Sequence, residues 1–410
     1  MRGLMWCVFL VPYLCLAAPK EVEQQAGYLQ QILRQADEAY YNKHESIISD
    51  AAYDALREQY DRLVETFPEL GNLEAVGASP VDAEEPLEHS VPVLSLQKAY
   101  TDEAVETFIS KCGMKLNYGI EPKIDGLTVV LRYRNGRLTQ AITRGDGKAG
   151  MDVTAALLAS GCVPMNLDQA PEILDVRGEV FMPHTAFNAL NERRRSKGKD
   201  LLKSPRNTAA GTLRLDDYTE VSRRGLAMQI FELLETDSLP ATHSQALAWM
   251  KEAGLPVVEC KVVGSSQVLS AIKQMNIQRL EMPFMTDGLV VKVNDRAVFQ
   301  KLGATAHHPR GALARKYKTS PVETKLMSVE WSKGTTGKIT PVAHFTPVEI
   351  QGATIQSATL HSPTHLRALD LKLGDWIQVV RAGGAVPEII GICPGRRTGE
   401  ETPIPTPEEM

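Results

Sequence analysis

The sequence has few cysteines, and they are not paired in the way that a structural zinc site requires. Six of the 410 residues are cysteine. Two lie in the apolar N-terminal segment and the other four are far apart: Cys7, Cys15, Cys112, Cys162, Cys260 and Cys393. Four-cysteine zinc sites are built from closely spaced pairs, and the sequence contains no Cys-x-x-Cys. We therefore expect neither a structural zinc nor a disulfide framework.

The chain also lacks an excess of positive charge. Its formal net charge is −5 and its isoelectric point is about 6.0, whereas a protein that holds nucleic acid by overall charge would be basic. Basic residues are instead concentrated in residues 191–214, where only Glu192 and Asp200 oppose them, and in residues 310–333. These stretches are either solvated surfaces or local contacts for phosphate groups.

The apolar run at residues 1–18 is too short for a membrane span and is interrupted by Pro12. It begins with a positive charge and ends with small residues, which is typical of a secretory signal. Cleavage would follow Ala17, because Pro19 disfavours a cut one residue later. The segment is therefore either an export signal or an apolar segment that is retained, and we expect no stable membrane association.

Residues 19–75 have the periodicity of two amphipathic helices. Apolar side chains recur at helical spacing over residues 28–40 and again over residues 53–67, and Pro68 closes the second series. Asp50 is a suitable N-cap for the second helix. We predict a helical hairpin, which by itself indicates only a packing unit.

Residues 76–325 are rich in sequence that favours strands. Asn135-Gly136 separates two such runs, which is a strong signal for a two-residue hairpin turn. Further strands are expected at residues 173–182, 228–234, 288–293 and 313–317, and helices at residues 183–195 and 244–253. This order predicts an antiparallel-rich α+β domain.

Short strands separated by glycine turns follow in residues 326–396. Five such segments are typical of a small β-barrel such as the OB-fold, although any small β-domain would fit. Residues 397–410 are rich in proline and glutamate, so we predict a disordered tail there. The predicted fold class is thus multidomain α+β, with a helical hairpin, an α+β domain and a C-terminal barrel.

Lys123 stands between two acids in Glu121-Pro-Lys-Ile-Asp125-Gly, directly before the predicted β-hairpin. Such a pattern is common at the surface, so alone it predicts little. Further charged motifs follow in order: Arg144-Gly-Asp-Gly, Arg177-Gly-Glu179, Ser-Pro-Arg206-Asn, Asp287-Gly-Leu-Val-Val-Lys292 and Lys316. Together they resemble the nucleotidyltransferase motifs of bacterial NAD-dependent DNA ligases, and the resemblance runs from about residue 33 to about residue 392.

The resemblance implies a chemistry centred on one lysine. Lys123 would attack the adenylyl phosphorus of NAD, expel nicotinamide mononucleotide (NMN) and carry AMP as a phosphoramidate. AMP would then pass to the 5′-phosphate of a nick, and the 3′-hydroxyl would displace it. Three further charged residues would take part in catalysis: Asp125, Lys292 and Lys316. A divalent ion, Mg²⁺ or Mn²⁺, is expected on the phosphates near Glu179 or Asp287.

The resemblance also implies the residues that bind the dinucleotide. A segment in front of the lysine, with Ser95 and Leu96, would close over the adenine. The helical hairpin would hold NMN through Tyr40, Asp50, Tyr53 and Asp54. The remaining contacts would come from the charged motifs: Glu121, Arg144, Glu179 and Arg206.

On this basis the predicted domains are a signal-like segment (1–18), an NMN-binding subdomain (19–75), a nucleotidyltransferase-type adenylation domain (76–325), an OB-fold domain (326–396) and a disordered tail (397–410). The partner would be nicked duplex DNA, held by its phosphates, and the chain is expected to be a monomer. The activity would belong in the cytoplasm, although residues 1–18 leave export possible. Within the family, the chain most resembles the short paralogue called ligase B.

A lysine must be uncharged to act as a nucleophile. If Lys292, Lys316 and Arg206 converge on Lys123, they would lower its pKa and neutralise the phosphate under attack. Phosphoryl transfer depends mainly on positioning and charge stabilisation, which a ring of cations supplies.

Several positions depart from the family pattern: Tyr41, Met151, Gly311, Arg315 and Thr335 stand for His, Glu, Trp, an aromatic residue and Arg. With no DNA-binding module after the barrel, they predict weak nick sealing and better-preserved self-adenylylation. Two alternatives stay open, namely an ATP-using lysine nucleotidyltransferase and a non-catalytic nick-binding protein. His307-His308 is expected to be solvated rather than to bind a metal.

Overall fold

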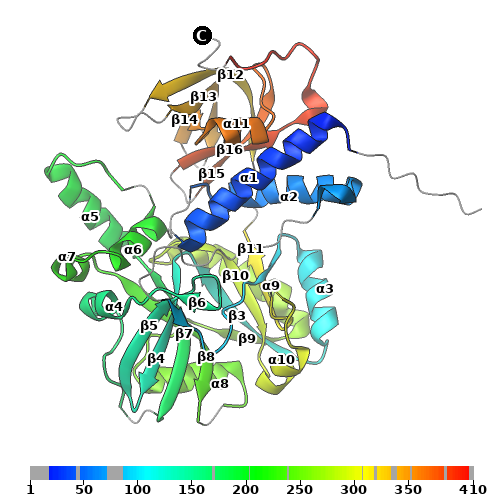
Figure 1. Ribbon diagram of the computed structural model, residues 1–410. Helices are drawn as coiled ribbons and strands as arrows, with labels where there is room; N and C mark the ends of the chain where they lie inside the picture. Colours follow the sequence, from blue (N-terminus) through cyan, green and yellow to red (C-terminus); the bar gives the residue numbers. More distant parts are fainter. Residues whose placement is uncertain are drawn as a thin grey trace, which may run out of the picture.

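The computed structural model describes residues 18–42, 47–71, 86–168, 171–202, 204–237, 240–306, 308–317, 321–333, 339–350, 353–382 and 386–405. It has a helical hairpin, an α+β domain and a β-barrel (Figure 1), so the predicted fold class is confirmed. The signal-like run up to residue 17 lies outside the described residues. Within the described part of the chain, no helix is long and apolar enough to cross a bilayer.

The hairpin consists of α1 (Lys20–Asn42) and α2 (Asp50–Thr66), followed by the short η1 (Pro68–Leu70). Its helices form because apolar side chains recur along one face of each, and Leu33 and Leu56 are completely buried. The predicted cap at Asp50 is wrong. Ser49 is the N-cap and accepts from the amide of Ala52, so Asp50 is the first residue of the helix.

One sheet of the α+β domain has five strands in the order β2-β11-β10-β3-β9. Its pairs are antiparallel except that of β11 with β2. The strands are β2 (Gln97–Ala99), β3 (Asn117–Ile124), β9 (Lys261–Gly264), β10 (Thr286–Val293) and β11 (Ala312–Lys316). Its core packs against α3 (Asp102–Cys112) and α9 (Val268–Gln278).

The second sheet has four antiparallel strands in the order β5-β4-β7-β8, and a short pair of β1 with β6 lies beside it. The predicted turn at Asn135-Gly136 is confirmed, with positive φ at both residues. The strands are β1 (Leu87–Glu88), β4 (Leu127–Arg134), β5 (Arg137–Thr143), β6 (Ala149–Gly150), β7 (Ile173–Phe181) and β8 (Ala227–Thr236).

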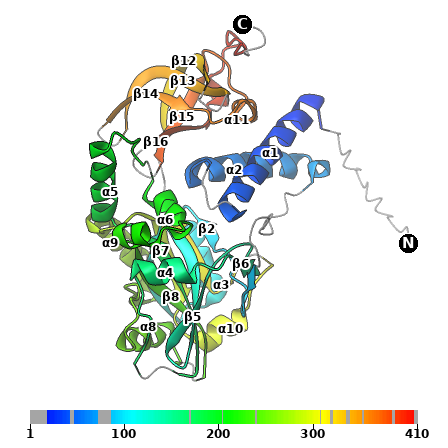
Figure 2. The ribbon, with the colours of Figure 1, turned by 60° about the vertical axis from the view of Figure 1, so that its left-hand side comes forward.

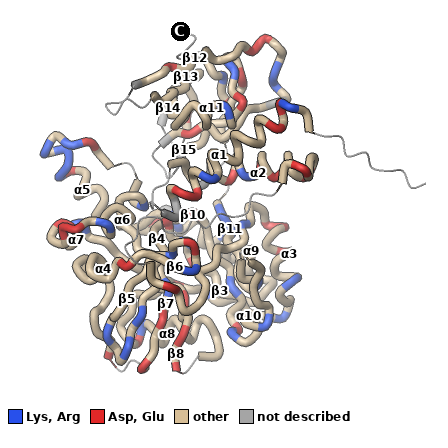
Figure 3. Tube along the Cα trace, viewed as in Figure 1, with Lys and Arg blue, Asp and Glu red and all other residues tan. Residues whose placement is uncertain are grey.

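Helices cover the two sheets and extend from them. The remaining ones are α4 (Thr154–Ser160), α5 (His184–Ser196), α6 (Pro205–Leu213), α7 (Tyr218–Arg223), α8 (His243–Glu252) and α10 (Arg296–Leu302), with short turns η2 (Ser265–Gln267) and η3 (Arg279–Glu281). Figure 3 shows Lys and Arg gathered at the end of α5, which projects from the domain.

The barrel is closed, in the order β12-β13-β14-β16-β15, which confirms the five-stranded prediction. Its elements are β12 (Val322–Lys333), β13 (Ile339–Ile350), β14 (Ala353–Thr359), α11 (Pro363–Ala368), β15 (Trp376–Ala382), β16 (Val386–Ile392) and η4 (Pro394–Arg396). Residues 397–405 of the predicted disordered tail are described by the structure, and several of them contact the barrel. Arg397 forms an ion pair with Asp375 at 2.7 Å, Thr402 forms an antiparallel β-bridge with Leu373, and Ile404 is buried.

The hairpin packs against the barrel and shares a hydrophobic core with it. That core contains Leu29 and Leu33 of α1 together with Leu366 of α11 and Ile389 of β16. Figure 2 shows α1 and α2 beside the barrel and above the sheets of the α+β domain. The Ser49 amide donates to Glu388 Oε1 at 3.1 Å, so the start of α2 is fixed on the barrel.

Candidate active site

Three neighbouring strands bring charged side chains to one level of the five-stranded sheet. Gly288 of β10 pairs with Lys123 on one side and with Lys316 on the other. A side chain would not fit there, because a Cβ at Gly288 would lie 2.6 Å from the Arg315 carbonyl oxygen. Asp287 lies between Thr286 and Gly288, where the pairing of β10 with β3 shifts register, and its carboxylate lies beside both lysines.

Asp287 is shared by the two lysines. Its Oδ2 lies 2.7 Å from Lys123 Nζ and 3.8 Å from Lys316 Nζ. The Lys316 side chain is only 7% exposed, whereas that of Lys123 is 27% exposed. Lys123 is therefore the amine that a ligand can reach, and Lys316 is a second cation behind it.

The hairpin reaches this pair of lysines through Asp54 of α2. Lys316 Nζ donates to Asp54 Oδ2 at 3.1 Å, and the same carboxylate binds Lys98 and the hydroxyl of Tyr100. The Lys98 ammonium also lies over the Tyr53 ring, 5.4 Å from its centroid. The predicted hairpin residues Tyr53 and Asp54 thus meet the predicted catalytic residues.

Asp125 lies where the chain leaves β3 for β4, and it binds an arginine of α6. Arg206 Nη1 donates to Asp125 Oδ1 at 2.6 Å. Ser204 caps α6 and Pro205 occupies its first turn, so the sequence fixes where this helix begins. The arginine is therefore held beside the loop that follows Lys123.

Glu179 of β7 is a half-buried carboxylate close to the same charges. Burial raises its pKa to about 7, although the nearby Lys123 and Arg206 act in the opposite direction. Thr128 Oγ1 donates to its Oε2 at 2.8 Å.

Asp287 binds lysine through Oδ2, but its other oxygen, Oδ1, is buried and has no hydrogen-bond partner among the described residues. Carboxylate oxygens are the ligands that Mg²⁺ prefers. The predicted residues Glu179 and Asp287 thus offer the type of ligand atom that a divalent ion would need.

A separate cluster surrounds Glu121, whose side chain is 1% exposed. Lys292 Nζ lies 2.9 Å from its Oε2, and the His243 ring binds its Oε1 through Nε2. Burial alone would raise the pKa of Glu121, but Lys292 and His243 outweigh it and hold the pKa at about 2. Lys292 also donates to the Phe231 carbonyl at 2.9 Å and lies 5.1 Å from the centroid of that ring.

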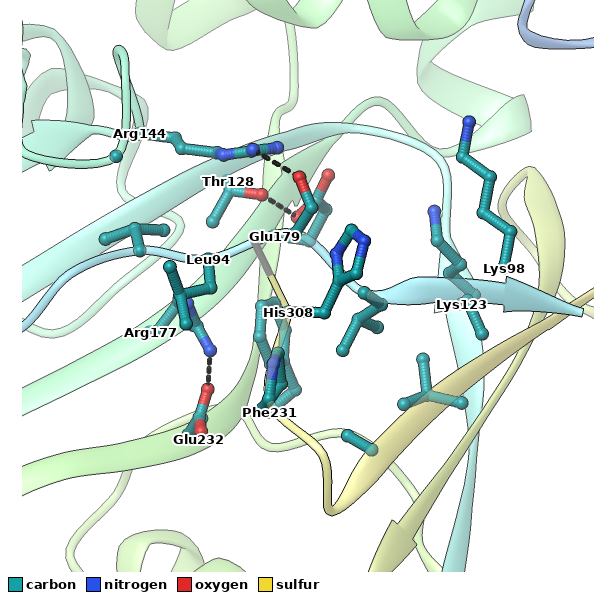
Figure 4. Close-up of a pocket in the computed structure, with 18 of the residues that line it drawn as sticks. Leu94, Lys98, Lys123, Thr128, Arg144, Arg177, Glu179, Phe231, Glu232 and His308 are labelled. Atoms are coloured by element: carbon teal, nitrogen blue, oxygen red, sulfur yellow. Dashed lines mark hydrogen bonds and ion pairs between the residues drawn. The ribbon is translucent and has the colours of Figure 1, made fainter. Parts of the chain in front are cut away.

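Arg144 crosses the cavity near the segment that was predicted to close over adenine. Its Nη2 donates to Ser95 Oγ at 2.7 Å, and its carbonyl contacts His89 Nε2 at 3.1 Å. Figure 4 shows Arg144 pointing along this wall, with Phe231 in another part of the cavity. The loop before β2 is thus tied to the second sheet.

A cavity of about 950 Å³ joins these groups. It is lined by ten of the predicted residues: Tyr53, Ser95, Leu96, Glu121, Lys123, Arg144, Glu179, Arg206, Lys292 and Lys316. The other predicted residues Asp54, Asp125 and Asp287 are bonded to members of this lining. The side chains of Tyr40 and Asp50 lie outside the described part of the structure.

One placement differs from the expectation. Lys292 was predicted to help neutralise the reacting phosphate, but its ammonium contacts Glu121 and Phe231 rather than sharing Asp287 with the other two lysines. The structure therefore assigns Lys123, Lys316 and Arg206 to one charged region and Lys292 to another.

Sequence reasoning missed several residues that line the cavity or support its wall: Asp37, Arg57, Lys98, Phe231, Glu232 and His243. Asp37 could have been found from the sequence, because it follows Leu33 by one helical turn and so lies on the buried face of α1. Burial raises its pKa to about 6. His243 and Phe231 could not have been found from the sequence, because only the packing of α8 and β8 brings them to the site.

Two departures from the family pattern have a local explanation. A Cβ at Gly311 would lie 2.5 Å from the Phe299 ring, which fills the space beside it. Arg315 binds Asp102 at 3.2 Å and donates to the Lys316 carbonyl at 2.7 Å. Nothing in the structure explains Met151. Thr335 and the side chain of Tyr41 lie outside the described residues.

The cavity and the domains around it correspond to known protein families. Residues 83–320, more than half of the chain, match the NAD-dependent DNA ligase adenylation domain. The chain belongs to the NAD-dependent DNA ligase family. The hairpin of this ligase-family chain, residues 19–75, matches the DNA ligase-like N-terminal NAD+-binding domain. Residues 323–401 match the NAD-dependent DNA ligase OB-fold domain.

Whole relatives show the same likeness. The chain is 36% identical to proteins named DNA ligase from Anoxybacillus flavithermus, over 400 residues, and from Thermomicrobium roseum, over 411 residues. Each match covers 95% of this chain and 59% of the relative. A DNA ligase of Petrotoga mobilis is also 36% identical, with 60% of its length covered. The chain thus spans about three fifths of the length of these relatives.

Proposed function

We propose that this chain is a DNA ligase that consumes NAD and joins a 5′-phosphate to a 3′-hydroxyl at a nick in duplex DNA. The observation that carries the proposal is the carboxylate of Asp287 shared by Lys123 and Lys316, in a cavity that the NAD+-binding hairpin helps to line. This arrangement provides an accessible amine, a proton acceptor and a second cation in one place.

In the first step, Lys123 Nζ attacks the adenylyl phosphorus of NAD. A nitrogen–phosphorus bond forms, the bond from this phosphorus to the bridging oxygen breaks, and NMN leaves with the electron pair. Asp287, 2.7 Å from the amine, is placed to accept its proton. Lys316 and Arg206 stabilise the negative charge that develops on the phosphate.

The Glu121 cluster suits the adenine end of NAD. Along one edge adenine presents a 6-amino donor beside the acceptor N1, and the carboxylate of Glu121 beside the ammonium of Lys292 complements both. The Phe231 ring offers an apolar surface for the base. We therefore propose that Lys292 recognises adenine rather than the reacting phosphate.

The helical hairpin suits the nicotinamide end of NAD. Its Tyr53 ring and the carboxylates of Asp54 and Asp37 are groups that attract a cationic aromatic ring such as nicotinamide. The match of residues 19–75 to an NAD+-binding domain supports this assignment.

Glu179 and Asp287 would hold a divalent ion, Mg²⁺ or Mn²⁺, which would neutralise phosphate charge when bound. Nicked duplex DNA would contact α5, where Arg193, Arg194 and Arg195 project from the domain, and the barrel. These contacts concern phosphates and require no base reading.

The deciding experiment is intact-mass analysis of the purified chain after exposure to NAD or to ATP. We expect an adenylate adduct with NAD only, and none in the Lys123→Arg variant. Lys251→Arg, an exposed position on α8, is the matched control and should be labelled like the parent. A parent that gains no adenylate from NAD, or a Lys123→Arg variant that seals nicks normally, would refute the proposal.

A further inference from the structure

The cluster behind the proposed adenine site contains a histidine to which the proposed reaction gives no role. His243 is the first residue of α8 and its side chain is 7% exposed. It binds one oxygen of Glu121, while Lys292 binds the other. A carboxylate that is almost completely buried is thus held from both sides.

The position of His243 is fixed by backbone contacts rather than by chance packing. Thr242 and Gln245 form a capping box at the start of α8. The His243 amide donates to the Asn294 carbonyl at 2.7 Å, which ties the helix to the strand end after Lys292. The two residues that hold Glu121 therefore belong to one connected unit.

Gly119 of β3 leaves room for Cys260 and the His243 ring. A Cβ at Gly119 would lie 2.7 Å from Cys260 Sγ and 3.7 Å from the His243 ring. Potential ligand atoms of Glu121, His243 and Cys260 lie within 4.8 Å of one another. We do not assign a metal to them, because the Lys292 ammonium, 2.9 Å from Glu121, already supplies the positive charge there.

We propose that His243 is a positioning residue that orients the carboxylate of Glu121 for recognition of the adenine amino group. This inference rests on the proposed function. Without the ring, the Oε1 atom of Glu121 loses its donor in a buried site, and the carboxylate turns towards Lys292. The acceptor and donor then no longer match the edge of the base.

The proposal distinguishes adenine from hypoxanthine. Hypoxanthine carries an oxo group at position 6, which a correctly oriented carboxylate repels, and a proton on N1, which opposes the ammonium of Lys292. Discrimination between NAD and nicotinamide hypoxanthine dinucleotide therefore measures the orientation of Glu121. A purely structural role of His243 would not change this ratio.

The test compares His243→Ala and His243→Gln in single-turnover adenylylation of Lys123, with both dinucleotides. For His243→Ala we expect the apparent KM for NAD to rise roughly tenfold or more while the limiting rate changes less than about threefold. The preference for NAD over the hypoxanthine analogue should fall by a similar factor. His243→Gln keeps an N–H donor and should recover most of both losses.

Gln245→Ala is the matched control, since it removes half of the capping box next to His243 without touching Glu121. It should keep the parental KM and discrimination. The inference is wrong if Gln245→Ala reproduces the alanine phenotype, if His243→Gln is as defective as His243→Ala, or if His243→Ala discriminates as the parent does. A parent that forms no adduct with NAD would instead refute the proposed function.

Discussion

At the scale of single residues, Asp287 connects the largest number of proposed roles. It lies at a register shift of β10, accepts contacts from two lysines and has one buried oxygen atom without a hydrogen-bond partner in the described structure. Its loss should therefore affect the chemistry more than the binding of NAD.

For Asp287→Asn we expect the rate of Lys123 adenylylation to fall roughly 100-fold or more, because the amine loses the group that accepts its proton. The KM for NAD should change much less. Asp168→Asn, an exposed position, is the control. Single-turnover kinetics give both parameters, and an unchanged limiting rate would contradict the assignment.

Asp37 allows a prediction about pH. Burial raises its pKa from 3.8 to about 6, although the Tyr53 hydrogen bond and the charges of Arg57 and Lys98 oppose this. Between these values the folded chain binds a proton that the unfolded chain has released. The free energy of unfolding therefore falls as pH rises through this window and stays lower above it.

Asp37→Asn removes this effect. We expect the variant to be about 1–3 kcal/mol more stable than the parent at about pH 8 and equal to it below about pH 4. Denaturant unfolding at several pH values measures the difference. A variant that is less stable at high pH would show that the ion-pair contacts of Asp37 outweigh its burial.

At the scale of elements, the sequence predicts what local rules determine. The Asn135-Gly136 turn, the helix expected at residues 183–195 and the strand at residues 288–293 agree with the structure to within a few residues. These segments carry their own turn, cap or periodicity signals. The cap of α2 was misplaced by one residue, because Ser and Asp are both good N-caps and adjacent here.

The alignment of β3, β10 and β11 is also an element-scale property, and Gly288 tests it. A Cβ there would meet the Arg315 carbonyl oxygen at 2.6 Å and the Lys316 Cα at 2.9 Å. We expect Gly288→Ala to cost about 1–3 kcal/mol and to impair adenylylation, because the strands must separate.

Gly27→Ala is the matched control for this change. Gly27 is an exposed position inside α1 where a Cβ meets nothing within 4 Å. Alanine should raise stability there by roughly 0.5–1 kcal/mol. Thermal unfolding of both variants decides the matter, and a harmless Gly288→Ala would mean that the strands can adjust.

At the scale of the whole molecule, the sequence is least informative. The motifs of the charged region could be found because their order is specific, and the register of three strands then brings them together. The joint core of the hairpin and the barrel could not be found, since residues such as Leu29 and Leu366 are far apart in sequence and fit any amphipathic surface. His243 could not be found either, because it is far from Glu121 in the sequence.

The docking of the hairpin can be tested at Glu388, which accepts from the Ser49 amide and lies 3.5 Å from His361 Nε2. In Glu388→Ala, amide exchange at the start of α2 should accelerate about tenfold, because a buried acceptor is lost. Exchange in the sheet that carries Lys123 should stay unchanged. Glu349→Ala, an exposed site on β13, is the control, and equal exchange in both variants would contradict the contact.

Ser49 and Asp54 lie five positions apart at the beginning of the same helix, a rise of roughly 7 Å. Ser49 binds Glu388 of the barrel, and Asp54 binds Lys316. A helical segment this short is stiff. A movement of the barrel that preserves the Ser49–Glu388 contact should therefore also displace Asp54. The first turns of α2 therefore connect the barrel to Lys316 directly.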